Sequence, residues 1–360
     1  MRICFFIDNI AHTGGTERVT TIIANQLVKF GIEVTILSLW GDGISSFKLD
    51  PLVELHSIYK NKDKFKYKIP STVISIRRFV KANHFDWLIT VESILSFFTI
   101  PACSFINIKQ IVWEHFNFNT NLGLRARSLA RRLAARFADH IVVLTTRDKE
   151  LWTSNLSCNA EIIAIPNPLP YAIQEVKQGR SKNVLAVGRL TYQKGFDLLI
   201  NAWSKVKDSY PDWHLNIVGN GEDLPLLQKL IESLCLNDNI HLYPGTKRID
   251  EFYSDSSIFC LSSRFEGLPM VLLESQAFGL PVVSFDCETG PSEVIKNGYN
   301  GILCKPEDII ELSEGLNKLI GDPLLRIEMS SNAFVNAQLF AAENITKQWI
   351  QLLQYEIKEE

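Results

Sequence analysis

Short apolar runs alternate along the chain with longer amphipathic stretches, and the alternation occurs twice. This rhythm is typical of βαβ units, in which helices cover both faces of a parallel sheet. In the first half it predicts one helix over residues 16–30, which Gly31 ends, and strands at residues 3–7, 34–39, 88–91, 111–113 and 141–144. In the second half it predicts strands at residues 184–187, 215–218, 240–242, 258–261 and 282–285, with helices that begin near Gly195, Glu222, Arg248, Pro269 and Pro291. The pattern therefore predicts an α/β protein with two Rossmann-like, doubly wound domains.

Prolines mark the boundary between the two halves. Pro166, Pro168 and Pro170 are followed by a polar run to Asn183, and proline lacks the N–H that a helix interior or a central strand requires. We therefore predict an N-terminal domain over residues 1–168 and a C-terminal domain over 169–340. Residues 341–360 have helical periodicity and an apolar face that contains Trp349, so this last helix needs a surface to pack against.

Composition narrows the class of protein. The 360 residues are 46% hydrophobic and 21% charged, which excludes disordered and fibrous chains and suits two globular domains. No apolar run is long enough for a membrane span or a signal-peptide core, so we expect a cytoplasmic protein. Seven scattered cysteines without a C-x-x-C pair predict neither a disulfide framework nor a zinc site.

The net charge of −3 conceals an asymmetry: residues 1–168 carry +6 and the remainder carries −9. Two basic stretches account for the positive half. Lys64 and Lys66 lie in a segment that interleaves lysines with aromatics, and Arg127, Arg131 and Arg132 lie in an amphipathic helix over residues 125–136. Such a helix can rest on the anionic inner face of the cytoplasmic membrane, although a solvated loop and an ordinary domain helix explain the pattern equally well. No nucleic-acid-binding motif is present, and we expect no nucleic-acid partner.

Two loops have the composition of phosphate sites. Gly14 and Gly15 stand between the first strand and its helix, where backbone N–H groups can approach a phosphate. A tight turn is the alternative, and the spacing differs from the G-x-G-x-x-G of nicotinamide-binding folds. Arg189 and Lys194 follow the first strand of the second half, where both cations can converge on a diphosphate; the alternative is solvated surface charge.

One glutamate precedes the predicted helix that begins at Pro269, and a second lies inside it. Glu266 lies in the loop before this helix, and Glu274 lies within an otherwise apolar part of it. A carboxylate that faces the core costs several kcal/mol unless it is hydrogen-bonded, and ribose hydroxyls would supply that bond. The alternatives are that Glu274 faces solvent or bonds to a neighbouring backbone N–H.

Together these motifs resemble glycosyltransferase family 4, which has the GT-B fold. The resemblance rests on E-x7-E from Glu266 to Glu274, G-R-L-x3-K-G over residues 188–195, the Gly14-Gly15 loop and the Ile-Pro-Asn-Pro linker over residues 165–168. It covers nearly the whole chain in the family's order and spacing. It implies two Rossmann-like domains facing a central cleft, with the last helix crossing back to the N-terminal domain.

The resemblance also implies a role for each motif. Arg189 and Lys194 would bind the diphosphate, Glu274 the ribose and Glu266 the hydroxyls of the transferred sugar. Gly14 and Gly15 would close over the phosphates. His115, in Trp113-Glu114-His115, matches a histidine that family members carry after a mid-domain strand; a core histidine is the alternative. The backbone N–H groups that would face the sugar and phosphates belong to Gly267, Leu268, Met270 and Val271. The implied catalytic residues are Glu266, His115, Arg189 and Lys194.

The expected reaction is retaining transfer of a hexose or N-acetylhexosamine from a nucleotide diphosphate sugar, UDP rather than GDP. The expected acceptor is a glycan or a lipid-linked glycan in polysaccharide, O-antigen or capsule biosynthesis. No D-x-D motif is present, so we expect no metal and no cofactor; Asp286-x-Glu288 is the nearest substitute. Two other functions remain open, namely a sugar-nucleotide epimerase of similar fold and a non-catalytic scaffold for a glycan-assembly complex.

Overall fold

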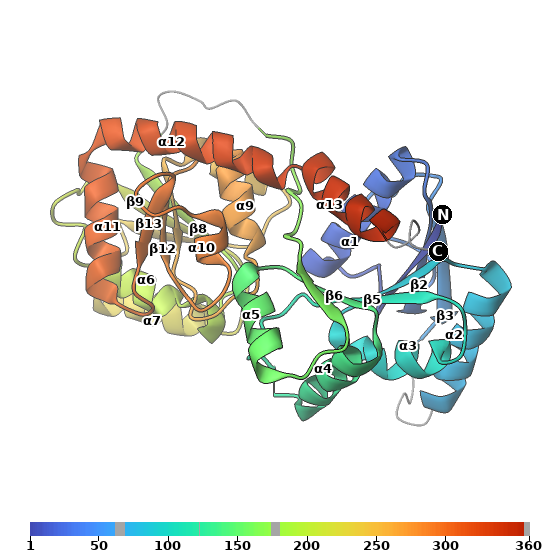
Figure 1. The fold of residues 1–360 in the computed structure, drawn as a ribbon. Helices are drawn as coiled ribbons and strands as arrows, with labels where there is room; N and C mark the ends of the chain where they lie inside the picture. The colour runs from blue at the N-terminus through green and yellow to red at the C-terminus, as the bar shows by residue number, and fades with distance from the viewer. Residues whose placement is uncertain (62–68, 122, 174–180, 356–360) are drawn as a thin grey trace. The chain divides into compact units, whose positions relative to one another are not determined.

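A computed structural model describes residues 1–61, 69–121, 123–173 and 181–355. The chain divides into two compact units. Unit 1 comprises Met1–Pro170 and Ala342–Glu360, and unit 2 comprises Tyr171–Ala341. Each unit is built on one parallel sheet, as the alternating pattern predicted (Figure 1).

The sheet of unit 1 has the strand order β3-β2-β1-β4-β5-β6-β7, and every pairing in it is parallel. Its strands are β1 (Arg2–Ile7), β2 (Glu33–Trp40), β3 (Glu54–Tyr59), β4 (Trp87–Val91), β5 (Lys109–Trp113), β6 (His140–Val143) and β7 (Glu161–Ala164). The order reverses between β1 and β4, and a crevice at such a reversal is where ligands of doubly wound sheets bind. The sequence pattern missed β3 and β7, which are the two edge strands.

Helices cover both faces of this sheet. Helix α1 lies on one face, and α2, α3 and α4 lie on the other, where they pack side by side (Figure 1). The helices of unit 1 are α1 (Gly15–Lys29), α2 (Ile69–Asn83), α3 (Ser96–Cys103), α4 (Arg125–Phe137), α5 (Thr146–Asn155) and α13 (Ala342–Tyr355).

The last helix, α13, belongs to unit 1 and packs against α1. Its Trp349 is fully buried, and the ring lies edge-on to that of Trp113 at 4.9 Å between centroids. Burial of such large aromatic surfaces contributes a few kcal/mol. The apolar face that the sequence left without a partner is thus part of the unit 1 core.

The sheet of unit 2 has the strand order β10-β9-β8-β11-β12-β13. Its strands are β8 (Asn183–Val187), β9 (His214–Val218), β10 (Ile240–Tyr243), β11 (Ile258–Leu261), β12 (Val282–Phe285) and β13 (Gly301–Cys304), the last of which the sequence pattern missed. Its helices are α6 (Phe196–Trp203), α7 (Leu224–Ser233), α8 (Ile249–Asp255), α9 (Met270–Ala277), α10 (Pro291–Val294), α11 (Ile309–Gly321) and α12 (Pro323–Ala337).

The described part of the chain contains no helix with both the length and the apolar character needed to cross a bilayer. All seven cysteines are free; five are buried, and Cys235 is exposed. Burial raises the pKa of the Cys103 thiol to about 12, which keeps it protonated and unreactive at neutral pH. Within the same described ranges no group of three or more His, Cys, Asp or Glu side chains could hold a metal ion.

Candidate functional site

The carboxyl end of the unit 2 sheet brings together two residues that the sequence singled out. Nζ of Lys194 donates to Oε1 of Glu266 over 2.6 Å, and the two side chains are only 16% and 7% exposed. Lys194 follows β8, and Glu266 lies in the loop between β11 and α9. A largely buried cation and a buried carboxylate thus stand side by side at the edge where parallel sheets bind their ligands.

Two glycines let the Lys194 loop adopt this path. A Cβ on Gly188 would lie 3.2 Å from the Lys194 side chain, which therefore runs directly over this glycine. Gly195 has φ of +60°, and a Cβ there would meet the carbonyl oxygen of Ser262 at 2.1 Å. A side chain at residue 195 is excluded both by its backbone conformation and by this close approach.

The loop that carries Glu266 is fixed by neighbours on two sides. The Gln193 amide donates to the Phe265 carbonyl at 3.0 Å, and the Thr289 hydroxyl donates to the Glu266 carbonyl at 2.6 Å. Arg264 forms a two-pronged pair with Asp197, at 2.9 and 2.7 Å. Glu266 is therefore held in place before any ligand binds, which reduces the entropy that binding must offset.

Glu274 is buried on α9, as its apolar surroundings in the sequence predicted. Its Oε2 accepts a hydrogen bond of 2.8 Å from the hydroxyl of Tyr253, which is itself completely buried. The Tyr253 ring stacks on Phe278, with 5.3 Å between centroids. A tyrosine from α8 is thus one partner of Glu274, a possibility that the sequence did not suggest.

The other predicted donor-site residues of unit 2 lie in the same two loops, after β8 and after β11, or at the start of α9. Arg189 is exposed, and its side chain makes no hydrogen bond to the residues that the structure describes. Helix α9 begins at Met270 with Pro269 as its N-cap, so Met270 and Val271 supply the first backbone N–H groups of the helix. Gly267 and Leu268 form the turn immediately before it.

In unit 1, Gly14 and Gly15 lie at the amino end of α1 and are exposed. A Cβ on Gly14 would meet a carboxylate oxygen of Glu17 at 2.5 Å, so the Glu17 side chain folds back over the start of its own helix. This places a negative charge beside the positive helix end.

His115 lies just past the end of β5, and its ring contacts that of Trp113 at 4.5 Å between centroids. Burial lowers its pKa to about 3, so the imidazole is neutral at physiological pH. Its Nε2 is buried and has no hydrogen-bond partner within the described ranges. A neutral imidazole with a spare nitrogen can accept or donate one hydrogen bond.

Arg131 contradicts the prediction that it faces a membrane, because it is 1% exposed. Its Nε donates to Glu114 at 3.1 Å, and its other nitrogens donate to the carbonyls of Asn117, Phe118 and Thr120. A buried guanidinium needs such partners to offset its desolvation. Arg131 therefore organises the loop after β5, and sequence spacing alone could not reveal this.

Arg127 is also buried, at 7% exposure, and pairs with Glu92 at 3.2 Å. Its predicted place on a membrane face is therefore wrong as well. The sequence did not single out Glu92; the only signal was its position after a predicted strand. Arg132 is exposed, as expected, whereas Lys64 and Lys66 lie outside the described residues.

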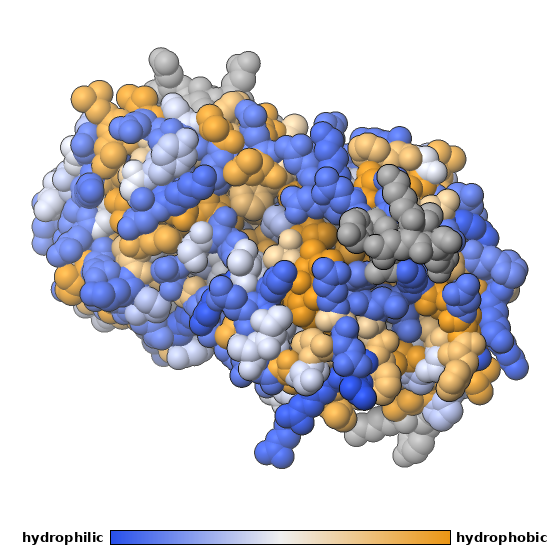
Figure 2. All heavy atoms as spheres, viewed as in Figure 1, coloured by the Kyte–Doolittle hydropathy of each residue, from blue (hydrophilic) through white to orange (hydrophobic). Residues whose placement is uncertain are grey.

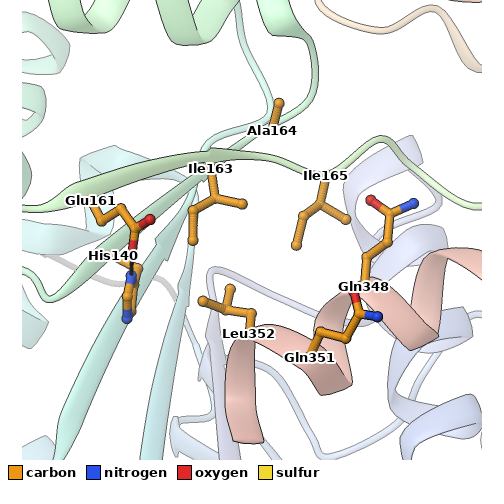
Figure 3. Close-up of a pocket in the computed structure, with 8 residues that line it drawn as sticks. All are labelled: His140, Glu161, Ile163, Ala164, Ile165, Gln348, Gln351 and Leu352. Atoms are coloured by element: carbon orange, nitrogen blue, oxygen red, sulfur yellow. Dashed lines mark ion pairs between the residues drawn. The ribbon is translucent and has the colours of Figure 1, made fainter. Parts of the chain in front are cut away.

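One cavity in unit 1, of about 380 Å³, lies away from these residues, between β6, β7 and α13 (Figure 3). At one side of it, Nδ1 of His140 lies 3.3 Å from the Glu161 carboxylate. The lining is formed by His140, Glu161, Ile163, Ala164, Ile165, Gln348, Gln351 and Leu352. None of these is a predicted site residue.

Two Rossmann-like units, with a paired cation and carboxylate at the sheet edge of the second, define the chain as an enzyme of the GT-B class of glycosyltransferases. The family model for glycosyl transferases group 1 matches residues 171–335, and that for Glycosyltransferase Family 4 matches residues 13–171. The chain therefore belongs to glycosyltransferase family 4, with the two models covering its two units in turn.

Relatives match along the whole chain. An uncharacterized glycosyltransferase of Haemophilus influenzae is 37% identical over 97% of this chain and 98% of its own. The amylovoran biosynthesis glycosyltransferase AmsD of Erwinia amylovora is 30% identical over 98% of this chain and 99% of its own. Among solved structures, S. aureus TarM in complex with fondaparinux, alpha-GlcNAc-glycerol and UDP superposes with a TM-score of 0.80 at 15% identity, over 98% of this chain and 99% of that one.

Proposed function

We propose that this enzyme transfers a hexose or N-acetylhexosamine from a UDP-sugar to a glycan or lipid-linked acceptor, with retention of configuration, in the synthesis of a surface polysaccharide. The observation that supports the donor site is the largely buried Lys194–Glu266 pair at the carboxyl end of the unit 2 sheet. It supplies one group that suits an anionic diphosphate and one that suits sugar hydroxyls.

Catalysis in this proposal is electrostatic and positional. Lys194 and Arg189 neutralise the charge that develops on the departing diphosphate, and Glu266 fixes the sugar by accepting its hydroxyl hydrogens. Glu274 accepts hydrogen bonds from the ribose while Tyr253 holds its carboxylate in place. Two cations do the work that a divalent metal performs in other transferases, so no metal is required.

The choice of UDP and of a polysaccharide product draws on similar proteins. TarM was crystallised with UDP, and AmsD is named for amylovoran biosynthesis. The acceptor side is assigned to unit 1, where His115 presents a neutral imidazole beside the end of β5.

We also propose that unit 1 rests on an anionic bilayer through the outer face of α4. With Arg127 and Arg131 turned inward, the outward positions carry exposed arginines beside exposed apolar side chains, and no acidic residue occurs in this helix. Leu129 and Phe137 are 57% and 60% exposed. Figure 2, seen from the same side as Figure 1, shows hydrophobic and hydrophilic residues side by side over the part of unit 1 where α3 and α4 lie. The proposed lipid-facing arginines are Arg125, Arg132 and Arg136.

The test of the donor proposal is a panel of nucleotide sugars. The one that the enzyme uses should stabilise the folded state by RT ln(1 + [L]/Kd) and so raise its melting temperature. UDP should be released when an acceptor is added. Conversion of the UDP-sugar to a different UDP-sugar without an acceptor would instead indicate an epimerase. No stabilisation by any nucleotide sugar would refute the donor site.

A further inference from the structure

Helix α4 holds two arginine–glutamate pairs one turn apart, and the two pairs are built differently. Arg131 pairs with Glu114, and Arg127 pairs with Glu92. The two carboxylates follow the ends of neighbouring strands, because β4 and β5 pair in parallel with Val91 opposite Trp113. Both pairs therefore lie at the carboxyl edge of the unit 1 sheet.

The Glu114 pair is complete. The carboxylate of Glu114 is 1% exposed and accepts hydrogen bonds from Arg131, from the Ser93 hydroxyl and from the backbone N–H groups of His115 and Phe116. Each of its oxygens has two donors. This pair has no capacity left for a ligand, and its role is to set the path of the chain that carries His115.

The Glu92 pair is incomplete. Glu92 has a side chain that is 24% exposed, and its carboxylate accepts one hydrogen bond, from Arg127, within the described ranges. Arg127 packs against the Phe116 ring at 4.4 Å, and its buried Nε and Nη1 have no hydrogen-bond partner among the residues that the structure describes. Buried polar groups are normally hydrogen-bonded, so an unsatisfied one in a native structure calls for an explanation such as a ligand.

The backbone at Glu92 is also unusual. Its φ is +76° and ψ is 132°, a conformation that L residues rarely adopt and that glycine adopts readily. Its N–H donates to the Trp113 carbonyl at 2.8 Å, which holds the turn in place. Strained residues that the surrounding structure holds in place cluster at functional sites, and here a glutamate stands where glycine would be easier to accommodate.

We propose that Glu92, oriented by Arg127, is an acceptor-binding residue whose carboxylate accepts a hydrogen bond from a hydroxyl of the acceptor sugar. This rests on the proposed transferase function and names a residue for its acceptor side. Glu92 and His115 come from adjacent strand ends, so one sugar could contact both. The charged groups that face Glu92 are Arg127 from α4, Glu114 from the end of β5 and Glu17 from α1.

Because of these surroundings, we expect acceptor binding to depend on pH. Burial raises the pKa of Glu92 to about 7; Arg127 opposes this shift, and Glu114 and Glu17 add to it. Above pH 7 the carboxylate is charged and accepts a hydroxyl hydrogen strongly, and below it the protonated acid accepts more weakly. Acceptor affinity should therefore fall as the pH is lowered from 8 to 6.

The experiment measures acceptor and donor binding separately on Glu92→Gln. Octyl glycosides of glucose, galactose and N-acetylglucosamine serve as acceptor probes, with binding followed by saturation-transfer NMR and turnover by UDP release. Loss of one charge-assisted hydrogen bond should weaken probe affinity about 10-fold to 100-fold at pH 8. The melting-temperature shift produced by UDP should stay the same, and the pH dependence of probe binding should disappear.

Glu33→Gln is the matched control, because it breaks an exposed arginine–glutamate pair with Arg2 in the same unit. It should leave probe binding unchanged. Glu92→Asp should restore part of the affinity, and Glu92→Gly, which suits the backbone conformation, should bind probe as weakly as Glu92→Gln.

Unchanged probe affinity in Glu92→Gln, or a wild type that binds none of the three glycosides, would overturn the acceptor role. Equal losses of probe and UDP binding in Glu92→Gln would overturn it too, by showing a general structural effect. Failure of UDP to stabilise the wild type would instead count against the donor proposal.

Discussion

Lys194 and Glu266 are separated by 72 positions in the chain, yet Nζ of the lysine lies 2.6 Å from a carboxylate oxygen of the glutamate. Each side chain is largely buried, so each charge depends on the other for its neutralisation. A ligand that engages both must offer an anion to the first and hydrogen-bond donors to the second. A nucleotide diphosphate sugar carries both kinds of group, with the diphosphate linked to the sugar that bears the hydroxyls.

Lys194→Ala should weaken UDP binding and lower kcat/KM by about two orders of magnitude, since a charge-assisted contact is worth roughly 1.5 to 3 kcal/mol. Calorimetry with UDP measures the first effect. Lys182→Ala is the control, because Lys182 pairs with Asp212 on the exposed surface of the same unit and should bind UDP as the wild type does. Unchanged UDP affinity in Lys194→Ala would remove this lysine from the donor site.

Substitutions of Glu266 and Glu274 should affect different steps. Glu274→Gln should raise the Kd for free UDP, whereas Glu266→Gln should leave UDP binding nearly intact and depress sugar transfer. Tyr253→Phe removes only the hydroxyl that holds Glu274, so it should weaken UDP binding less than Glu274→Gln does. Equal effects of the two Glu→Gln changes on UDP binding would show that the ribose and sugar assignments are wrong.

Transfer should survive excess EDTA, because Arg189 and Lys194 supply the positive charge that a bound divalent ion would otherwise provide. The measurement is UDP release with and without the chelator, followed by addition of Mn²⁺. Activity that EDTA abolishes and Mn²⁺ restores would make Asp286 and Glu288 the first residues to test as ligands.

Neighbouring arginines on α4 should differ sharply in their effect on stability. Arg131→Ala should lower the free energy of unfolding by about 3 to 5 kcal/mol, because it leaves the buried carboxylate of Glu114 without its cation. Arg132→Ala, one residue further along and exposed, should change it by no more than about 0.5 kcal/mol. Denaturant titrations of the two variants measure both free energies of unfolding. Similar values would refute the inference that Arg131 is held in place by buried partners.

Membrane association should depend on the exposed arginines of α4 and not on the buried Arg127 and Arg131. Arg125, Arg132 and Arg136 changed together to Glu should abolish sedimentation with anionic liposomes, since each cation near such a surface contributes about 1 kcal/mol. Wild type should bind at low salt and be released at 1 M, where the Debye length is about 3 Å. UDP binding should persist in the triple variant. Sedimentation that ignores both lipid charge and these changes would leave α4 an ordinary solvated helix.

The sequence predicted the two sheets well because their central strands are continuous apolar runs. It missed β3, a half-polar edge strand with the sequence Glu-Leu-His-Ser-Ile-Tyr, and the short strands β7 and β13. β3 mixes polar with apolar residues, and β7 and β13 are mostly apolar runs of only four residues, which periodicity alone does not assign to a strand.

The site was harder to predict where long-range pairing decides the outcome. Arg127 and Arg131 have the spacing of a solvated basic face, but their partners, Glu92 and Glu114, arrive from distant strand ends and draw them inward. Tyr253 reaches Glu274 from another helix in the same way. Local patterns locate the charged residues. Which of them are buried and paired depends on residues that only the folded sheets bring together.

Trp349 packs against Trp113, so the chain returns to complete unit 1 after it has built the whole of unit 2. Unit 2 is consequently one uninterrupted stretch, Tyr171–Ala341, inserted within the sequence of its neighbour. A chimera that exchanges donor specificity between relatives can therefore swap this stretch as a single cassette. A single splice at the midpoint would pack Trp113 against the final helix of the other protein. The core of unit 1, which was meant to stay unchanged, would then lose stability.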